Sequence, residues 1–302
     1  LFCKNIYYMS IKTSKILIPI DFSNQSMYAL NQACSLAQTK NSKVYILSVI
    51  EEQNKISSLF LDDQTDILQN KVKSKLNQIC EEIHLKYKID IEVMVSKGKV
   101  YNQIIDVSKM ISTDLIVMGT TGSPKEGFKR FIGSNAERVV RLAQCPVITI
   151  KGQNLRKGCQ NIILPLDLEK ETREKITYAI EYARYWDATI RLVSVLIDDN
   201  QHNKNVLIKN INQAERFIKD AGVSCSAELV SGDKKVTLGD FVFNYAKEND
   251  GDLIMIMTKK EELSLSQNIS VTARYIINNS EIPVMSIRPK KQNYANKSSV
   301  SF

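Results

Sequence analysis

The chain has 302 residues, about twice the usual length of a single domain, so two domains are expected. Its 43% hydrophobic and 25% charged residues are typical of soluble globular proteins, and no apolar run is long enough to span a membrane. The net charge of +8 comes from scattered lysines, and two histidines with six cysteines lacking a C-x-x-C pair argue against a His-based metal centre, a Ser-His-Asp triad or a disulfide framework.

Five short, β-branched apolar runs in the first half are predicted to be strands. They lie at residues 16–20, 44–50, 91–95, 114–118 and 146–150. Between them, apolar residues recur every three or four positions, which predicts helices at 24–39, 65–87, 101–111 and 134–143. Strands that alternate with helices over such distances must run parallel, with right-handed crossovers. The expected fold is α/β, with a doubly wound five-stranded parallel sheet.

The strand pattern then begins again, which indicates an internal duplication. NIILPLD at 161–167 echoes KILIPID at 15–21, and IRLVSVL at 190–196 echoes VYILSVI at 44–50. DLIMIMT at 252–258 echoes DLIVMGT at 114–120, and IPVMSIRP at 282–289 echoes CPVITIKG at 145–152. Four matches in the same order predict two tandem domains, at 13–151 and 159–289, with disordered tails at 1–12 and 290–302.

The strongest functional signal follows the fourth strand, in GTTGSPKEGFKRFIGSN at 119–135. Gly119 and Gly122 allow the backbone to approach an anion closely, because they have no Cβ. Gly133 and Ser134 open the next helix, whose unpaired N–H groups and positive dipole end suit a phosphate. Three basic residues add positive charge nearby: Lys125, Lys129 and Arg130. The segment lies at the carboxyl end of a parallel strand, where open α/β sheets bind ligands.

Two further strand ends would complete a nucleotide pocket. The carboxylate of Asp21, after the first strand, is placed to accept hydrogen bonds from ribose hydroxyls. Val49, at the end of the second strand, would offer backbone groups to the adenine edge and methyl groups to its face. Simpler roles exist, because glycines after a strand often only form turns, and Asp21 could cap the helix that starts near Ser23 or Asn24. The joint order of these residues on one fold favours the nucleotide pocket.

The first half resembles a universal stress protein domain over residues 13–151. ATP-binding members of that family carry G-x-x-G, nine residues and then G-[S/T], and the residues that match those places are Gly119, Gly122, Gly133 and Ser134. The resemblance implies an adenine nucleotide α-hydrolase-like fold, with Asp21 as the ribose-binding aspartate and Val49 as the adenine-side valine. The residues expected to bind ATP, with or without Mg²⁺, are Asp21, Val49, Met118, Gly119, Gly122, Gly133, Ser134 and Asn135.

The first half departs from the family pattern at one point. Ten residues, 123–132, separate Gly122 from Gly133 in place of nine, and Pro124 stiffens this connection. A surface loop absorbs one extra residue at modest cost, whereas a phosphate cradle tolerates it less well.

The second half departs further. Its corresponding segment, KKEELSLSQNIS at 259–270, contains no glycine. Lys259 would place a side chain where the backbone should approach phosphate, and Ser270 lacks the glycine that precedes Ser134, although Asp167 and Val195 survive. We therefore expect no ATP in the second half, which would serve as a structural partner of the first.

The resemblance implies an ATP-binding, cytoplasmic stress-response regulator with no catalytic residue or metal site and no efficient catalysis, at most slow ATP hydrolysis or autophosphorylation. Family domains commonly pair through their fifth strands, so we expect this pairing within the chain, with a homodimer of tandem chains left open and neither membrane nor nucleic acid as partner. The alternative is a pseudo-dimeric interaction scaffold that binds no nucleotide. An adenylating enzyme is less favoured, because its phosphate loop would follow the first strand, where DFSNQS at 21–26 has no glycine.

Overall fold

A computed structural model of the chain describes residues 14–38, 42–51, 62–120, 132–153, 157–166, 173–197, 200–232, 236–258 and 269–289. The first half contains β1 (Lys15–Pro19), α1 (Asn24–Gln38), β2 (Lys43–Ile50), α2 (Asp62–Tyr87), β3 (Ile91–Lys97), α3 (Val100–Met110), β4 (Leu115–Gly119), α4 (Ser134–Leu142) and β5 (Val147–Ile150). The second half contains β6 (Asn161–Leu166), α5 (Arg173–Trp186), β7 (Thr189–Leu196), α6 (Gln201–Asp220), β8 (Cys225–Ser231), α7 (Leu238–Glu248), β9 (Leu253–Met257), α8 (Val271–Asn279) and β10 (Val284–Ile287).

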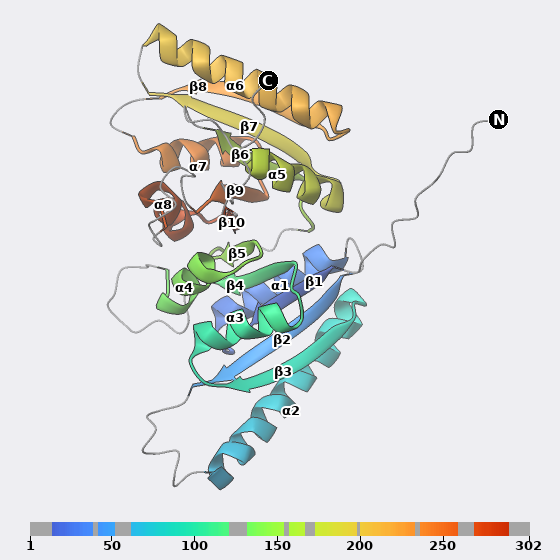
Figure 1. Ribbon diagram of the computed structural model, residues 1–302. Helices are drawn as coiled ribbons and strands as arrows, with labels where there is room; N and C mark the ends of the chain where they lie inside the picture. The colour runs from blue at the N-terminus through green and yellow to red at the C-terminus, as the bar shows by residue number, and fades with distance from the viewer. Residues whose placement is uncertain are drawn as a thin grey trace, which may run out of the picture.

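The strands form one ten-stranded sheet in the order β3-β2-β1-β4-β5-β10-β9-β6-β7-β8. Neighbouring strands within each half run parallel, which confirms the predicted α/β class with a parallel sheet. The two halves meet where β5 and β10 pair antiparallel, with Ile148 opposite Met285 (Figure 1). The fifth strand of each half therefore forms the seam between the halves.

The element boundaries agree with the apolar periodicity where the ends of an element are apolar. All five predicted strands of the first half lie within two residues of the observed ones. Helix α2 differs most, because it begins at Asp62, three residues before the predicted start at 65. The residues Asp62, Asp63 and Gln64 are polar, and a polar first turn leaves no trace in the periodicity.

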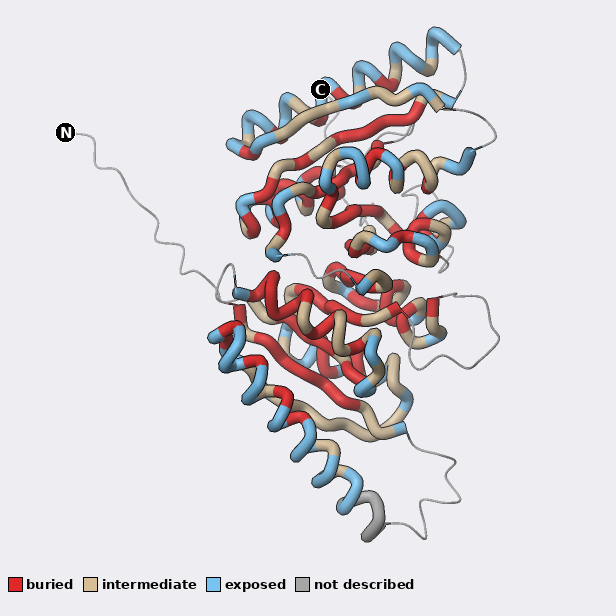
Figure 2. The backbone as a smooth tube through the Cα atoms, turned by 180° about the vertical axis from the view of Figure 1, so that it is seen from behind, coloured by how far each residue is buried: buried red, intermediate tan, exposed pale blue. Residues whose placement is uncertain are grey.

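Helices cover both faces of the sheet and divide its core into two layers. One layer packs against α1, α2, α5 and α6, and the other against α3, α4, α7 and α8. Successive strand residues point to opposite faces, so Ile16 and Ile18 enter the first layer while Leu17 enters the second. Figure 2 shows the central strands buried and the outward sides of α2 and α6 exposed. No helix within the described ranges combines the length and apolarity needed to cross a bilayer.

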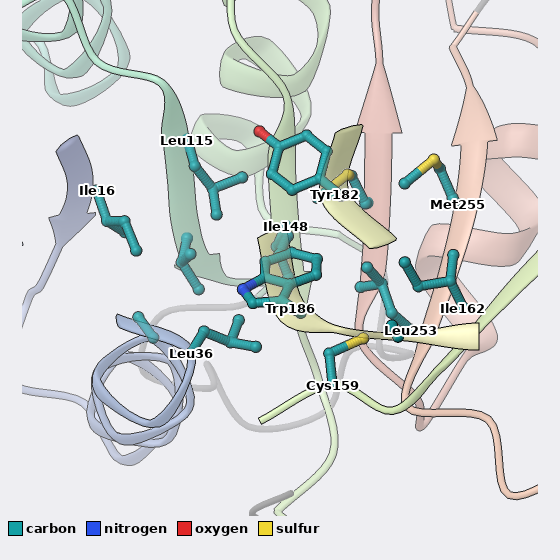
Figure 3. Packing of buried hydrophobic residues seen from close by; sticks show 14 of the residues in the cluster. Ile16, Leu36, Leu115, Ile148, Cys159, Ile162, Tyr182, Trp186, Leu253 and Met255 are labelled. Carbon is teal, nitrogen blue, oxygen red and sulfur yellow. The ribbon is translucent and has the colours of Figure 1, made fainter. Parts of the chain in front are cut away.

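The first layer of the core continues across the seam between the halves. Figure 3 shows Tyr182 and Trp186 of α5 lying among Leu115 and Ile148 of the first half and Ile162 of the second. Trp186 is only 3% exposed, and its ring centroid lies 5.0 Å from that of Tyr182. The Tyr182 hydroxyl donates a hydrogen bond of 3.1 Å to the carbonyl oxygen of Asp114. The halves are therefore packed together by apolar contact as well as by strand pairing.

The five cysteines in the described ranges form no disulfide bond with one another. Burial is the main cause that raises the pKa of Cys34 and of Cys145 to about 12, and that of Cys80 to about 11. These side chains stay protonated at neutral pH and belong to the core or its margins.

Candidate functional site

The predicted site residues gather at one edge of the sheet. Asp21, Val49 and Gly119 stand at or just beyond the carboxyl ends of β1, β2 and β4, which are neighbours in the order β2-β1-β4. Strands β1 and β4 are in register through Leu17 and Ile116, so their ends lie side by side. The other predicted contributors, Gly122 and the basic residues Lys125, Lys129 and Arg130, lie outside the described residues, as does Pro124.

Backbone hydrogen bonds bring the start of α4 to the end of β4. The Gly133 N–H donates to the carbonyl oxygen of Thr120 at 2.6 Å, and the Thr120 N–H donates to that of Ile150 at 3.0 Å. The two ends of the segment 121–131 are thus held together. The Thr120 hydroxyl is buried and makes no hydrogen bond in the described part of the chain.

Among the described residues, no side chain caps the amide groups at the start of helix α4. Its N-cap residue is Gly133, in an extended conformation with φ −62° and ψ 147°, and glycine has no side chain to accept from the first turn. Ser134 is exposed and Asn135 is half-buried at the first two helical positions. An anion at this end of α4 would meet N–H groups that have no side-chain partner among the described residues, together with the positive end of the helix dipole.

Gly119 has a packing role that the sequence did not reveal. A Cβ at this position would lie 3.1 Å from both the carbonyl carbon and the carbonyl oxygen of Gln25, at the start of α1. The Gln25 side-chain amide in turn donates to the carbonyl oxygens of Ile150 at 3.1 Å and Lys151 at 2.5 Å. Gly119 thus allows α1 to approach the ends of β4 and β5.

Asp21 positions the cap of α1, and Ser23 is the cap itself. One carboxylate oxygen of Asp21 accepts from the Ser23 N–H at 3.0 Å and from the Ser23 hydroxyl at 2.5 Å. The Ser23 hydroxyl oxygen accepts from the Ser26 N–H at 3.2 Å, three residues into the turn. The hypothesis that Asp21 caps this helix is therefore wrong in its choice of residue. Phe22 between them has φ 62°, a strained conformation for a bulky residue.

The remaining two predicted residues contribute differently. Met118 is 6% exposed and its side chain belongs to the core, so only its backbone faces the sheet edge. Val49 is half-buried against the same layer. The contacts of Ser23 and Gln25 at this edge were not predicted, because Asp21 was taken as the polar residue of the run DFSNQS that acts there. Its S-x-x-S spacing is the signal that could have revealed a helix N-terminus.

At the corresponding edge of the second half, Ser270 caps α8 with its own side chain. Its hydroxyl oxygen accepts from the Ala273 N–H at 3.2 Å, and its N–H donates to the carbonyl oxygen of Thr258 at 2.8 Å. The latter bond matches the one from Gly133 to Thr120. Ser270 therefore corresponds to Gly133, and the alignment of Ser270 with Ser134 is wrong by one residue. Lys259 and Asp167 lie outside the described residues, and Val195 is buried.

The neighbouring helix α7 is capped as well. The Thr237 hydroxyl oxygen accepts from the Asp240 N–H at 3.2 Å, and the same hydroxyl donates to the Asp240 carboxylate at 2.7 Å. The Tyr275 hydroxyl donates to the other carboxylate oxygen at 2.9 Å. The Thr237 hydrogen bond, followed by that of Tyr275, lowers the pKa of Asp240. In the first half, Lys99 at the start of α3 makes no capping side-chain bond.

Within the described ranges, no group of three or more His, Cys, Asp or Glu side chains could hold a metal ion.

Known proteins resemble this chain both in sequence and in fold. The sequence profile of the universal stress protein family matches residues 12–151. A universal stress protein of Methanocaldococcus jannaschii is 32% identical over 149 residues, a match that spans 45% of this chain and 81% of the relative. The chain belongs to the universal stress protein family.

Two further proteins resemble the chain, one in sequence and one in fold. Another universal stress protein of M. jannaschii is 27% identical over 165 residues, covering 48% of this chain and 99% of the relative. The crystal structure of a universal stress protein from Archaeoglobus fulgidus superposes with a TM-score of 0.71 at 18% identity, covering 92% of this chain and 99% of that one. At that identity the likeness concerns the fold alone, but it extends over both halves.

Proposed function

We propose that this universal stress protein binds one ATP per chain, in the first half, through the backbone amides that open α4. The observation that carries the proposal is the side-chain-free N-cap at Gly133, held by Thr120 at the end of β4. Amide groups without a partner are costly unless water or a ligand satisfies them. A triphosphate would supply strong acceptors and the negative charge that this dipole end favours.

Two neighbouring strand ends would hold the nucleoside. Asp21 is exposed, and both of its hydrogen bonds to Ser23 use the same carboxylate oxygen. The second oxygen is then the one to accept from a ribose hydroxyl. Val49 would contact the adenine at the end of β2, and Gly122 with the basic residues of 123–132 would complete the contact with phosphate.

The same proposal assigns a regulatory role without efficient catalysis. ATP occupancy would act as the signal in a stress response, and the rate of ATP turnover would be slow compared with nucleotide exchange. Mixing the protein with ATP and following ADP formation tests this part. A turnover number of about 1 s⁻¹ or more, within the usual range of enzymes, would contradict it.

Equilibrium dialysis of nucleotide-free protein against labelled ATP tests the binding. We expect saturation at one ATP per chain and a rise in the midpoint of thermal unfolding with ATP concentration, because a ligand of the folded state stabilises it. Gly133→Ser should weaken ATP binding about twofold, because a serine side chain accepts from the same amides and is worth a few tenths of a kcal/mol more than glycine at a cap position.

The matched control is the mirror change in the second half. Ser270→Gly removes a cap at the corresponding position and should leave the ATP affinity unchanged. Absence of saturable binding would overturn the proposal and favour the interaction scaffold that binds no nucleotide. Two ATP molecules per chain would overturn its restriction to the first half.

A further inference from the structure

Helix α8 of the second half contacts the start of α4 in the first half at two polar points. The side-chain oxygen of Asn278 accepts from the Ile132 N–H at 2.9 Å, one residue before the N-cap Gly133. The Arg274 guanidinium lies 2.8 Å from a carboxylate oxygen of Glu137, in the first turn of α4. Figure 1 shows α4 and α8 next to each other at the seam between the halves.

Glu137 has the wrong charge for its position if α4 holds an anion. It lies three residues after Ser134, about 5 Å farther along the helix axis at 1.5 Å per residue. A carboxylate this near would repel a phosphate at the helix N-terminus. Arg274 neutralises that carboxylate, and the arginine comes from the half that has no open helix end of its own at this edge.

The two charged residues occupy equivalent positions in the duplicated halves. Glu137 is the fourth residue after the N-cap Gly133, and Arg274 is the fourth after the N-cap Ser270. The backbone bonds agree, because Glu137 N–H donates to Gly133 and Arg274 N–H to Ser270. Two identical halves would place like charges opposite each other here. The opposite charges therefore suit this particular pairing of a first half with a second half.

We propose that α8 is the contribution of the second half to the anion site of the first. Arg274 removes the repulsion from Glu137, and Asn278 fixes the chain where it enters α4. Both are positioning residues, since they act through α4. The ligand in this proposal rests on the proposed function, whereas the coupling between α8 and α4 does not.

Charge substitution tests the role of Arg274. The Glu137 and Arg274 side chains are 35% and 47% exposed, so the pair adds little stability and its variants should fold. We expect Arg274→Gln to weaken ATP binding about three- to tenfold at low salt, and less at high salt, because exposed charges are screened. The affinity for adenosine, which carries no phosphate, should not change.

A double variant separates charge from shape. Glu137→Gln combined with Arg274→Gln removes both charges and should restore ATP affinity to within about twofold of the wild type. Lys219→Gln is the matched control, because it breaks an exposed pair with Glu215, 2.6 Å apart, on the distant helix α6. Unchanged ATP affinity in Arg274→Gln, or equal losses for ATP and adenosine, would overturn the role of Arg274.

Hydrogen exchange tests Asn278 without any nucleotide. In Asn278→Ala the Ile132 amide loses its acceptor, so its exchange should accelerate about tenfold or more in the ligand-free protein, while the amide of Ile276 in α8 keeps its rate. Unchanged exchange at Ile132 would overturn the coupling. If the wild type binds no ATP but Ile132 responds as expected, the proposed function fails and the coupling between α8 and α4 stands.

Discussion

The two halves have the same strand order, but they differ in how the N-termini of their last two helices are capped. In the second half, Thr237 and Ser270 cap α7 and α8 with their own hydroxyl groups. In the first half, the equivalent positions are Lys99 and Gly133, and neither supplies a side-chain cap in the described structure. The last two helices of the second half therefore have side-chain caps, whereas those of the first half have none among the described residues. This difference is the reason that the proposed ATP site is assigned to the first half.

The contacts between the last two helices of each half are also exchanged. In the first half, the Arg138 guanidinium of α4 lies over the Tyr101 ring of α3, 4.7 Å from its centroid. In the second half, the aromatic ring is Tyr275 on α8, and it packs against Gly239 of α7. Both contacts join the last two helices of a half, but the Tyr275 hydroxyl also donates a hydrogen bond to Asp240 and so links α8 to α7 a second time.

The largest effect is expected where the halves share a core. Trp186→Ala removes a side chain that is 3% exposed and should lower the free energy of unfolding by about 3–5 kcal/mol. Urea unfolding followed by circular dichroism measures this change. Because Trp186 contacts residues of both halves, we expect one transition shifted as a whole. Phe217→Ala, at a 49% exposed site on α6, is the control. A loss confined to the second half would show that the halves unfold independently.

A smaller effect is expected at the α7–α8 contact. A Cβ on Gly239 would lie 2.5 Å from Cδ1 of Tyr275, so Gly239→Ala forces the ring aside and should cost about 1–3 kcal/mol. Thermal unfolding monitors the loss. Adding Tyr275→Ala should make the glycine change nearly neutral relative to Tyr275→Ala alone. If the two costs simply add, the steric explanation is wrong.

The caps give an effect of opposite sign in the two halves. Ser270→Ala removes the hydroxyl that accepts from Ala273 and should lower the free energy of unfolding by about 1 kcal/mol. Gly133→Ser introduces a cap and should raise it by a few tenths of a kcal/mol, roughly the serine–glycine difference at this position. Chemical denaturation of both variants tests the comparison. Equal destabilisation by both changes would mean that the first amides of α4 already have hydrogen-bond partners and gain nothing from a serine cap.

The smallest effect is a pH dependence confined to the second half. Hydrogen bonds from Thr237 and Tyr275 lower the folded-state pKa of Asp240. The resulting stabilisation is present above the unfolded pKa of an aspartate and is lost as the pH falls through the lowered folded pKa. The difference in stability between wild type and Asp240→Asn should therefore shrink as the solution becomes more acidic than about pH 4. A difference that stays constant from neutral to acidic pH would contradict this.

The strands were predictable because each is a short apolar run, and the site edge because Gly119 and Asp21 follow two such runs. The register of the second half was not. Residues 121–132 separate Thr120 from Gly133, whereas 259–269, one residue fewer, separate Thr258 from Ser270. Continuing the fourth-strand alignment without a gap would place Ser270 opposite Ile132, and matching serine to serine placed it opposite Ser134, so neither found its counterpart Gly133. Arg274 and Asn278 could not be found either, because they meet α4 only when the chain folds back across the seam.

The pairing of β5 with β10 within one chain also removes protein concentration from the equilibrium that joins the halves. Two separate domains would part on dilution, by mass action, and Glu137 would lose Arg274. Here the linking residues 151–160 keep the partners together at any copy number. A cell that makes only a few molecules of this protein would have the same α4–α8 contact in each of them.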